Sequence, residues 1–203
     1  MEVKIPKTKK GKLTLFSLCV SAENMFKNKG FHGTTIKDIT NDAGVGLGTF
    51  YVYFKSKKSI YDYLLLQYSH KIRSQIAKNI QAHRVGSKKE MERIGIRTFL
   101  QIVLENPHIY NIIWESLYID KTLFVNYYTN FAEHYANSIK AGQTEGEIYD
   151  DIDPEVLAFS LMGISNFVGL RWTMFEKSEE KLDYVTDNIM KLLEHGMFTN
   201  KEK

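Results

Sequence analysis

The residues best suited to a chemical task lie between Gly33 and Lys57, where hydroxyl, lysine and tyrosine side chains recur at helical spacing. Hydroxyls, ammonium groups and helix-start amides hold DNA phosphates, whereas base edges are read by a short helix in the major groove. The pattern therefore predicts an outward-facing strip suited to DNA, made of Leu47, Gly48, Thr49, Tyr51 and Tyr53, and an anion such as a phosphate beside Lys57 at the start of the next helix.

Two short helices joined by a tight turn must position these residues. Thr34 or Thr35 can cap a first helix that ends near Asp42. Gly44 follows and can take the positive φ that such a turn needs. A second helix from about Gly46 to Tyr53 then presents its polar side outward, as a recognition helix does to a major groove. The stretch therefore has the pattern of a helix-turn-helix.

The order and spacing of these residues resemble those of the DNA-binding domain of the tetracycline-repressor (TetR) family. The matching residues are Phe31-His32-Gly33-Thr34-Thr35, Ile39, Ala43-Gly44-Val45, Gly48-Thr49-Phe50-Tyr51-Val52-Tyr53-Phe54, Lys57 and Ile60. The resemblance implies an all-helical homodimer with a three-helix DNA-binding head and a variable helical body that binds a small inducer. It also implies DNA-contacting roles for Thr34, Thr35, Lys37, Leu47, Gly48, Thr49, Tyr51, Tyr53 and Lys57. It does not cover the ligand specificity of the body.

Base readout is the least determined property of this surface. Where many members of that family have a long polar side chain, this chain has Gly46 and Leu47. Lys37, Thr49 and Tyr53 remain as candidates for contacts to base edges. Leu47 could contact a thymine methyl group, or it could be a helix-surface residue without a role, and the sequence leaves both open.

Charge is divided unevenly along the chain. Although the formal net charge is +3, residues 1–86 carry 15 Lys and Arg against 5 Asp and Glu, a net of +10. Residues 87–203 carry 12 against 19, a net of −7. A basic amino-terminal part joined to an acidic remainder is typical of a phosphate-binding head on a body that does not face phosphate.

The composition of the 203 residues excludes several classes of protein. With 43% apolar residues, the chain can bury a packed core and is not disordered. A single cysteine, Cys19, excludes an intrachain disulfide and a cysteine metal cluster, and it favours a reducing, cytoplasmic setting. No apolar run approaches the roughly 20 residues that span a bilayer. We therefore expect a soluble cytoplasmic protein without a membrane partner.

Apolar residues recur at helical spacing along the chain, which predicts an all-α fold of about nine helices. We expect an N-terminal three-helix helix-turn-helix DNA-binding domain over residues 1–56. A C-terminal helical ligand-binding and dimerisation domain should cover residues 57–203, and a long helix over 57–81 should connect the two. Gly30 is expected to end the first helix and Ser178 to cap the last one.

Aromatic and apolar side chains on the later helices could line a mostly apolar pocket with a few polar anchors. The candidate ligand-binding residues are Tyr110, Trp114, Phe124, Tyr128, Phe131, Phe159, Met162, Asn166 and Arg171. For any one of them, an ordinary place in the core is the alternative. Arg171 could hold a ligand carboxylate or form an ion pair at a subunit interface. The ligand is expected to be a small apolar or amphipathic molecule.

A helix that is apolar on almost every side runs from Pro154 to about Phe175. Such a helix needs partners all round, and a second subunit would supply them. Gly163, Ser165 and Gly169 are small enough to let another helix approach closely. We therefore expect the last two helices of each subunit to form a four-helix dimer interface, as the resemblance also implies.

The residues do not form a recognisable catalytic or metal site. Six histidines are scattered without a metal-ligand spacing, and no nucleophile elbow is present. The glycine-rich run from Gly44 to Gly48 lacks the strand that precedes a nucleotide-binding loop. The acidic turn from Asp150 to Asp153 lacks the other ligands of a calcium loop. No catalytic residue, metal or cofactor is expected.

The sequence as a whole predicts a dimeric, ligand-responsive transcriptional regulator. We expect a repressor that binds a pseudo-palindromic operator in double-stranded DNA and is released by a mostly apolar small-molecule inducer. Two alternatives remain open. One is a DNA-binding protein without a small-molecule ligand, against which the large aromatic body argues. The other is an enzyme on a helical scaffold, against which the absence of a catalytic constellation argues.

Overall fold

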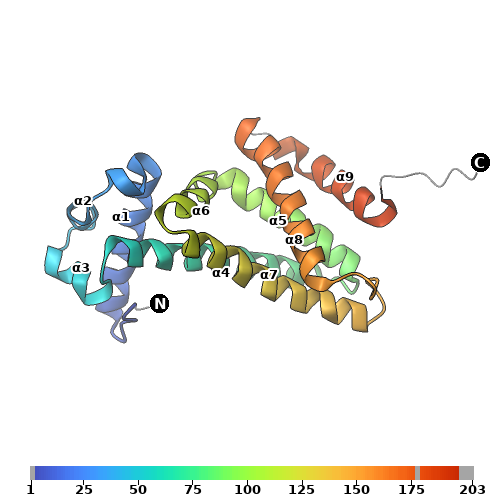
Figure 1. Ribbon diagram of the computed structural model, residues 1–203, viewed down its shortest axis with the longest axis horizontal. Helices are drawn as coiled ribbons and strands as arrows, with labels where there is room; N and C mark the ends of the chain where they lie inside the picture. The colour runs from blue at the N-terminus through green and yellow to red at the C-terminus, as the bar shows by residue number, and fades with distance from the viewer. Residues whose placement is uncertain (1–2, 177–178, 197–203) are drawn as a thin grey trace, which may run out of the picture. The chain divides into compact units, whose positions relative to one another are not determined.

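Helices are the regular elements of the computed structural model over the residues that it describes, 3–176 and 179–196 (Figure 1). In chain order they are α1 (Lys9–Gly33), α2 (Ile36–Asp42), α3 (Leu47–Tyr53), α4 (Lys57–His83), α5 (Lys88–Glu105), α6 (His108–Ile119), α7 (Lys121–Thr144), α8 (Pro154–Gly169) and α9 (Leu182–His195). A π-helical segment, Leu170–Phe175, continues α8, and a short 3-10 helix, Glu179–Lys181, precedes α9. No strand occurs in these ranges, which confirms the all-α expectation. The expected cap at Ser178 lies outside the described residues.

The chain divides into two compact units. The first runs to Lys71 and includes His108–Thr129, whereas the second comprises Ile72–Pro107 and the described residues from Asn130 onward. α4 and α7 each contribute residues to both units. The division groups α6 with the helix-turn-helix and separates it from α8 and α9. The domain boundary predicted near residue 56 stays a prediction.

The first helix buries one side and bends near its end. Thr8 caps it, because the Thr8 hydroxyl accepts the Gly11 N–H at 3.1 Å. Gly30 has a φ of 68° and interrupts the helical geometry, but α1 continues beyond this bend to Gly33 and does not end at Gly30, where the sequence predicts its end. The buried apolar residues of α1 recur every three or four positions: Leu15, Leu18, Ala22 and Phe26.

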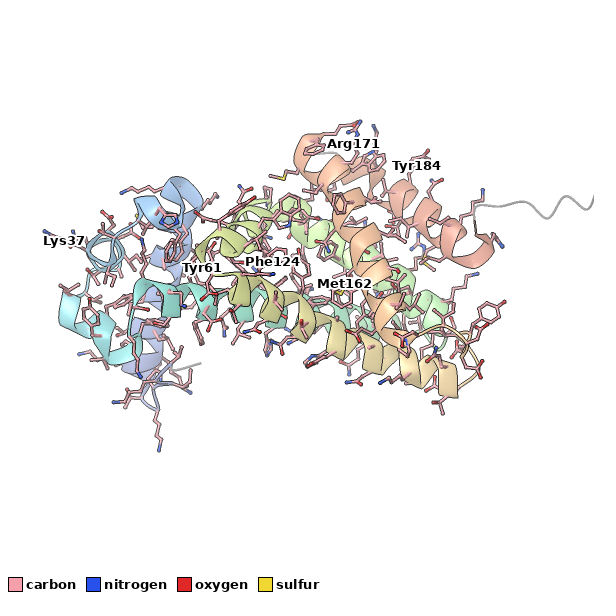
Figure 2. The ribbon with its side chains drawn as sticks, viewed as in Figure 1. Lys37, Tyr61, Phe124, Met162, Arg171 and Tyr184 are labelled. Carbon is pink, nitrogen blue, oxygen red and sulfur yellow. The ribbon has the colours of Figure 1, made fainter. Side chains whose placement is uncertain are left out.

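Tyr61 joins α1, α4 and α6 at the centre of the first unit (Figure 2). Its ring is fully buried, with the ring centroid 4.9 Å from that of Phe26 and 5.3 Å from that of Phe31. Its hydroxyl donates to the Ile112 carbonyl oxygen at 2.6 Å and lies 3.2 Å from Glu115 Oε2. Burial raises the pKa of Tyr61, so its hydroxyl keeps the proton that it donates.

Two charged side chains hold the backbone that joins α1 to α2. The Phe31 N–H donates to Glu115 Oε1 of α6 at 2.7 Å. The Lys57 ammonium, at the start of α4, donates to the carbonyl oxygens of Phe31 and Thr34, the latter at 2.5 Å. It also lies 4.2 Å from the centroid of the Phe31 ring. Burial lowers the pKa of Lys57, while Glu115 and Asp38 favour its charged form. We call this arrangement the α1–α2 junction.

In the second unit, α5 and α9 pack side by side. Their contact is built from a buried apolar cluster: Ile96, Leu100, Leu182, Val185, Ile189 and Met190. Along its exposed edge, cations of α5 pair with carboxylates of α9, each at 2.8 Å: Lys89–Glu194, Arg93–Asp187 and Arg97–Asp183. Exposed pairs of this kind contribute about 0–1 kcal/mol each, so the apolar cluster carries most of the stability of the contact.

Replacing Gly30 by alanine is expected to destabilise the first unit. The residue has a φ of +68°, and an alanine Cβ there would lie 2.8 Å from Glu115 Oε1. A non-glycine residue in such a conformation costs about 1–3 kcal/mol. Urea unfolding should show a decrease in stability of that size. Gly48→Ala is the matched control, because no atom lies within 4 Å of its added Cβ. Equal stability of the two variants would show that the bend does not require glycine.

Candidate functional site

The helix-turn-helix begins with a reciprocal cap at Thr35. The Thr35 hydroxyl accepts the Asp38 N–H at 3.1 Å, and the Asp38 carboxylate accepts the Thr35 N–H at 2.8 Å. Hydrogen bonds from Thr35 lower the pKa of Asp38. Such a capping box fixes the residue at which a helix begins. Of the two caps that the sequence allows for α2, Thr35 is therefore the one used.

The turn between α2 and α3 is made by Gly44. This residue has a φ of 65°, and the following Val45 N–H donates to the Thr40 carbonyl oxygen at 3.0 Å. No atom lies within 4 Å of the position that a Cβ at Gly44 would take. The position therefore favours glycine for its backbone conformation and not for lack of space.

α3 buries one side and exposes the other. Phe50 is fully buried, whereas Leu47 is 51% and Tyr51 55% exposed. A Cβ at Gly48 would meet no atom within 4 Å, so this position is open as well. Val52 is exposed to a similar degree and belongs to the same side, although it is not among the contacts predicted from the sequence. Its spacing of four residues from Gly48 was the available signal.

α2 adds a cation and a hydroxyl to this exposed side. Lys37 is exposed and lies on the outer side of α2, and its side chain makes no ion pair within the described ranges (Figure 2). Thr35 is also exposed, and Thr49 on α3 is half-buried. We call the following set the α2–α3 surface: Thr35, Lys37, Leu47, Gly48, Thr49, Tyr51 and Val52.

Three of the predicted DNA-contacting side chains are engaged within the first unit. Thr34 is 1% exposed, and its hydroxyl donates to the Gly30 carbonyl oxygen at 2.7 Å, so its side chain is not part of the α2–α3 surface. Tyr53 is half-buried, and its hydroxyl donates to the Gly11 carbonyl oxygen at 3.3 Å. Lys57 uses two of its N–H donors on backbone carbonyls of the α1–α2 junction. DNA contacts by Tyr53 and Lys57 stay predictions, and each would have to share or replace these bonds.

Four of the predicted ligand-binding residues lie in the first unit as two aromatic pairs. On α6, the ring centroids of Tyr110 and Trp114 are 6.0 Å apart, and on α7 those of Phe124 and Tyr128 are 4.8 Å apart. Tyr110 is buried, whereas Trp114 is 39% exposed. Burial raises the pKa of Tyr110 and of Tyr128, so both phenols are neutral near pH 7.

The other predicted ligand-binding residues lie in the second unit: Phe131, Phe159, Met162, Asn166 and Arg171. Met162 is buried on α8, and the Asn166 side chain donates to its carbonyl oxygen at 2.7 Å. Phe131 is half-buried and Phe159 is exposed. Arg171 is exposed and pairs with Glu176 at 2.6 Å. Within this chain, the arginine is therefore engaged by a near neighbour, while the ligand and interface roles predicted for it stay predictions.

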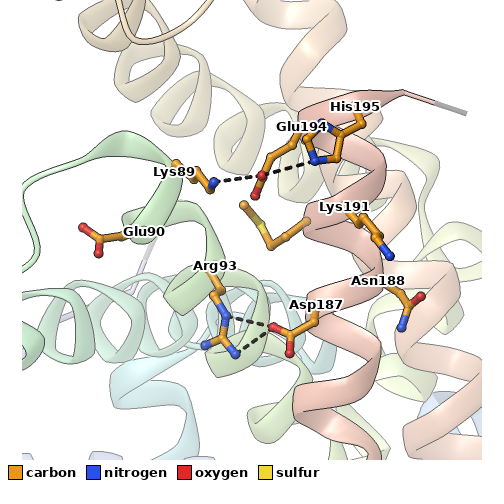
Figure 3. Close-up of a pocket in the computed structure, with 9 residues that line it drawn as sticks. Lys89, Glu90, Arg93, Asp187, Asn188, Lys191, Glu194 and His195 are labelled. Atoms are coloured by element: carbon orange, nitrogen blue, oxygen red, sulfur yellow. Dashed lines mark hydrogen bonds and ion pairs between the residues drawn. The ribbon is translucent and has the colours of Figure 1, made fainter. Parts of the chain in front are cut away.

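Other parts of the described chain offer little chemistry. A shallow groove between α5 and α9 contains none of the predicted ligand-binding residues, and most of its charged lining is already paired (Figure 3). No group of three His, Cys, Asp or Glu side chains suited to a metal ion occurs within residues 3–176 and 179–196. None of the helices described has the length and apolar character needed to cross a membrane.

Comparison with known proteins identifies relatives of the helix-turn-helix and of most of the chain. Residues 18–64 match the family described as bacterial regulatory proteins, tetR family. The chain is 27% identical over 155 residues to the HTH-type transcriptional repressor KstR2 of Rhodococcus jostii (strain RHA1). That match covers 74% of this chain and 75% of the relative.

Solved structures share the fold along most of the chain. The transcriptional regulator FadR from Bacillus subtilis, in complex with stearoyl-CoA, superposes with a TM-score of 0.74 at 18% identity, covering 90% of this chain and 99% of that one. The fatty acid degradation regulator FadR from Bacillus halodurans superposes with a TM-score of 0.76 at 16% identity, covering 93% and 96%. At these identities the similarity is one of fold.

Removing exposed groups from the α2–α3 surface is expected to weaken binding to duplex DNA without unfolding the protein. Removal of a good base contact costs about 1–3 kcal/mol, and removal of a phosphate contact lowers the salt slope by about 1. We expect effects of this size for Lys37→Ala and Tyr51→Ala, measured by fluorescence anisotropy. Lys140→Ala, an exposed lysine of α7, is the control. If both test variants bind like the wild type, DNA contacts a different surface.

Proposed function

We propose that this chain, a transcriptional regulator of the tetR family of bacterial regulatory proteins, is a dimeric repressor. A small, mostly apolar ligand releases it from its operator. The proposal includes a pseudo-palindromic operator and a cytoplasmic location. Two neighbouring residues of α6 carry it. Trp114 belongs to an aromatic pair suited to a ligand, and Glu115 accepts a hydrogen bond from the α1–α2 junction.

The repressor role and the operator symmetry rest on the relatives and on dimer geometry. A relative that is 27% identical is named a transcriptional repressor. Two recognition helices in a two-fold dimer meet successive major-groove faces when they are about 34–36 Å apart, and such a dimer reads two inverted half-sites. A change of a few ångströms in that spacing weakens binding, which is how a ligand could release the protein.

An acyl chain attached to a polar group is the ligand class that we propose. FadR from Bacillus subtilis, a structural relative, is in complex with stearoyl-CoA. In this chain, the aromatic side chains of α6 and of the first half of α7 offer the apolar surface that an acyl chain requires. The buried phenol of Tyr110 supplies a neutral polar group on the same helix.

A ligand that moves α6 would act directly on the DNA-binding head. Glu115 follows Trp114 on α6 and accepts the Phe31 N–H, and Tyr61 of α4 donates to the carbonyl oxygen of Ile112. Displacement of α6 therefore strains the α1–α2 junction and the first half of α4 together. The ligand can shift the DNA-binding equilibrium only by the difference between its affinities for the two arrangements, typically about 1–3 kcal/mol.

The exposed side of α8 supports dimerisation through the last two helices. Val156, Phe159 and Phe167 are exposed at helical spacing, and Phe167 is 71% exposed. A Cβ at Gly163, on the same side, would meet no atom within 4 Å. Gly169 is buried within the chain, so Gly163 replaces it as the glycine at a close helix crossing. An apolar side of this kind is typical of a surface covered by a second subunit.

Selection from a random pool of DNA duplexes, with the purified protein as bait, tests the proposed function. We expect an inverted repeat to be enriched, and native mass spectrometry of the protein from its own host to show a retained small molecule with an acyl chain. Enrichment of a single, non-repeated site would contradict the dimeric operator. A protein that retains and binds no acyl compound would contradict the ligand class.

Replacing Phe167 by glutamate is expected to weaken the dimer. Burying an unpaired carboxylate is costly, and removing a central interface aromatic commonly costs about 2 kcal/mol or more, so the dimer Kd should rise roughly 30-fold. Phe16→Glu on α1 is the matched control, because Phe16 is exposed to a similar degree, 66%. Sedimentation equilibrium measures the dimer Kd of both variants. An unchanged dimer constant for the Phe167 variant would move the interface away from this side of α8.

Breaking the Glu115 contact is expected to uncouple ligand binding from DNA binding. In Glu115→Ala the Phe31 N–H has no acceptor on α6. The coupling free energy, obtained from the ratio of operator affinities without and with ligand, should therefore fall by about 0.5–2 kcal/mol. Glu115→Gln keeps an acceptor oxygen and should retain more of the coupling. Glu133→Ala, an exposed glutamate of α7, is the control. A folded Glu115→Ala variant with the wild-type ratio would show that the coupling takes another route.

A further inference from the structure

Five lysines gather just before α1 and in its first turn. Residues 3–12 contain Lys4, Lys7, Lys9, Lys10 and Lys12 and no Asp or Glu. All five are exposed, and none makes an ion pair within the described ranges. We call residues 3–7 the arm. Uncompensated cations gathered this closely repel one another, and an external polyanion would offset the repulsion.

The arm is fixed against the recognition helix. The Lys4 N–H donates to the Tyr53 carbonyl oxygen at 3.3 Å, and the Tyr53 hydroxyl donates to the Gly11 carbonyl oxygen at 3.3 Å. A Cβ at Gly11 would lie 2.7 Å from Pro6 Cβ, so the arm packs closely against the first turn of α1. Figure 1 shows the start of the chain at this end of α1, close to α3. The last residue of α3 therefore anchors both the arm and α1.

We propose that the arm is a second DNA-contacting element, in which Lys4 and Lys7 hold backbone phosphates beside the groove that α3 enters. This inference rests on the proposed function. Lys4 is hydrogen-bonded to the last residue of α3, and a helix about 10–12 Å in diameter fills a major groove about 12 Å wide. Phosphates that border the groove are therefore within reach of the arm. Ammonium groups contact phosphate without reading bases, so the arm adds affinity and no sequence preference.

The contacts of Tyr53 lower the entropic cost of DNA binding by the arm. A disordered lysine tail loses conformational entropy when it binds, whereas a tail already tied to α3 loses less. Tyr53 is the last residue of α3, and its carbonyl oxygen holds the arm at Lys4. Its hydroxyl holds the first turn of α1, against which the arm packs. Its role at the interface is then to position the arm, in place of the base contact predicted from the sequence.

The salt dependence of DNA binding tests the arm. We would compare Lys4→Ala/Lys7→Ala with the wild type on a duplex of random sequence and on the duplex obtained by selection. The slope of log K against log salt should fall by about 0.9 for each phosphate that the variant no longer neutralises. Affinity should fall by the same factor on both duplexes, because the arm reads no bases. Lys78→Ala/Lys140→Ala, which removes the same charge from exposed sites in the second unit, is the matched control.

Two results would overturn the proposal. One is a wild-type slope for Lys4→Ala/Lys7→Ala on both duplexes, and the other is an equal decrease of slope in the control, which would indicate a general charge effect. If no duplex is enriched by selection, the proposed function fails, but the random duplex still reports on the arm. A lower slope on that duplex alone would then support the arm as a phosphate-binding element.

Gly11→Ala tests the anchoring separately. Alanine favours helix over glycine by up to about 1 kcal/mol, which offsets the pressure of the added Cβ on the Thr8 cap of α1, 3.1 Å away. The same Cβ would lie 2.7 Å from Pro6 Cβ, so it displaces Pro6 and with it the arm. We expect the salt slope to fall towards that of Lys4→Ala/Lys7→Ala while the protein melts, by circular dichroism, at a temperature no lower than the wild type. Gly95→Ala in α5, where the nearest atom is 3.7 Å from the added Cβ, is the control. A stable Gly11→Ala protein with the wild-type slope would show that the arm does not need this anchor.

Discussion

The hydrogen bond from the Phe31 N–H to the Glu115 carboxylate is the interaction on which the placement of the DNA-binding head depends. It joins α6 to the backbone immediately before α2, at a bend that requires the positive φ of Gly30. Lys57 holds the same residue from the opposite side through its carbonyl oxygen. A half-buried carboxylate and a half-buried ammonium are costly to leave unpaired, so the bend, the first half of α4 and α6 are expected to move as one body.

The distribution of charge differs between the surface proposed to contact DNA and the contact between α5 and α9. Within the described residues, Lys37 of α2 and the lysines at the start of α1 are exposed and lack carboxylate partners. Lys89, Arg93 and Arg97 of α5, by contrast, are paired with carboxylates of α9. The unpaired lysines leave a positive potential that attracts a polyanion. The exposed ion pairs between α5 and α9 contribute little to stability and keep the edge of that helix contact polar. The division of charge seen along the sequence therefore separates a surface suited to phosphate from surfaces that pair internally.

Much of the head could be predicted because its signals are local. A threonine cap before α2, the Gly44 turn and the bend at Gly30 each depend on a few neighbouring residues, as does the burial of Phe50. What the sequence could not predict depends on how the bent backbone presents its polar groups and on partners far along the chain. Thr34 and Thr35 are chemically alike, and only the carbonyl of Gly30 decides that Thr34 turns inward.

Lys57 and Arg171 illustrate the same limit of local patterns for charged residues. A lysine at a helix start suggests a phosphate, yet the carbonyl oxygens that engage Lys57 come from residues more than twenty positions earlier. The carboxylate that engages Arg171 follows the helix on which the arginine lies.

The most direct test of the coupling between α6 and the DNA-binding head is a titration of the protein–operator complex with stearoyl-CoA, with tryptophan fluorescence and DNA anisotropy recorded together. We predict that ligand binding and DNA release occur at the same concentrations, with a coupling of about 1–3 kcal/mol; saturation of the tryptophan signal with unchanged DNA affinity would contradict it.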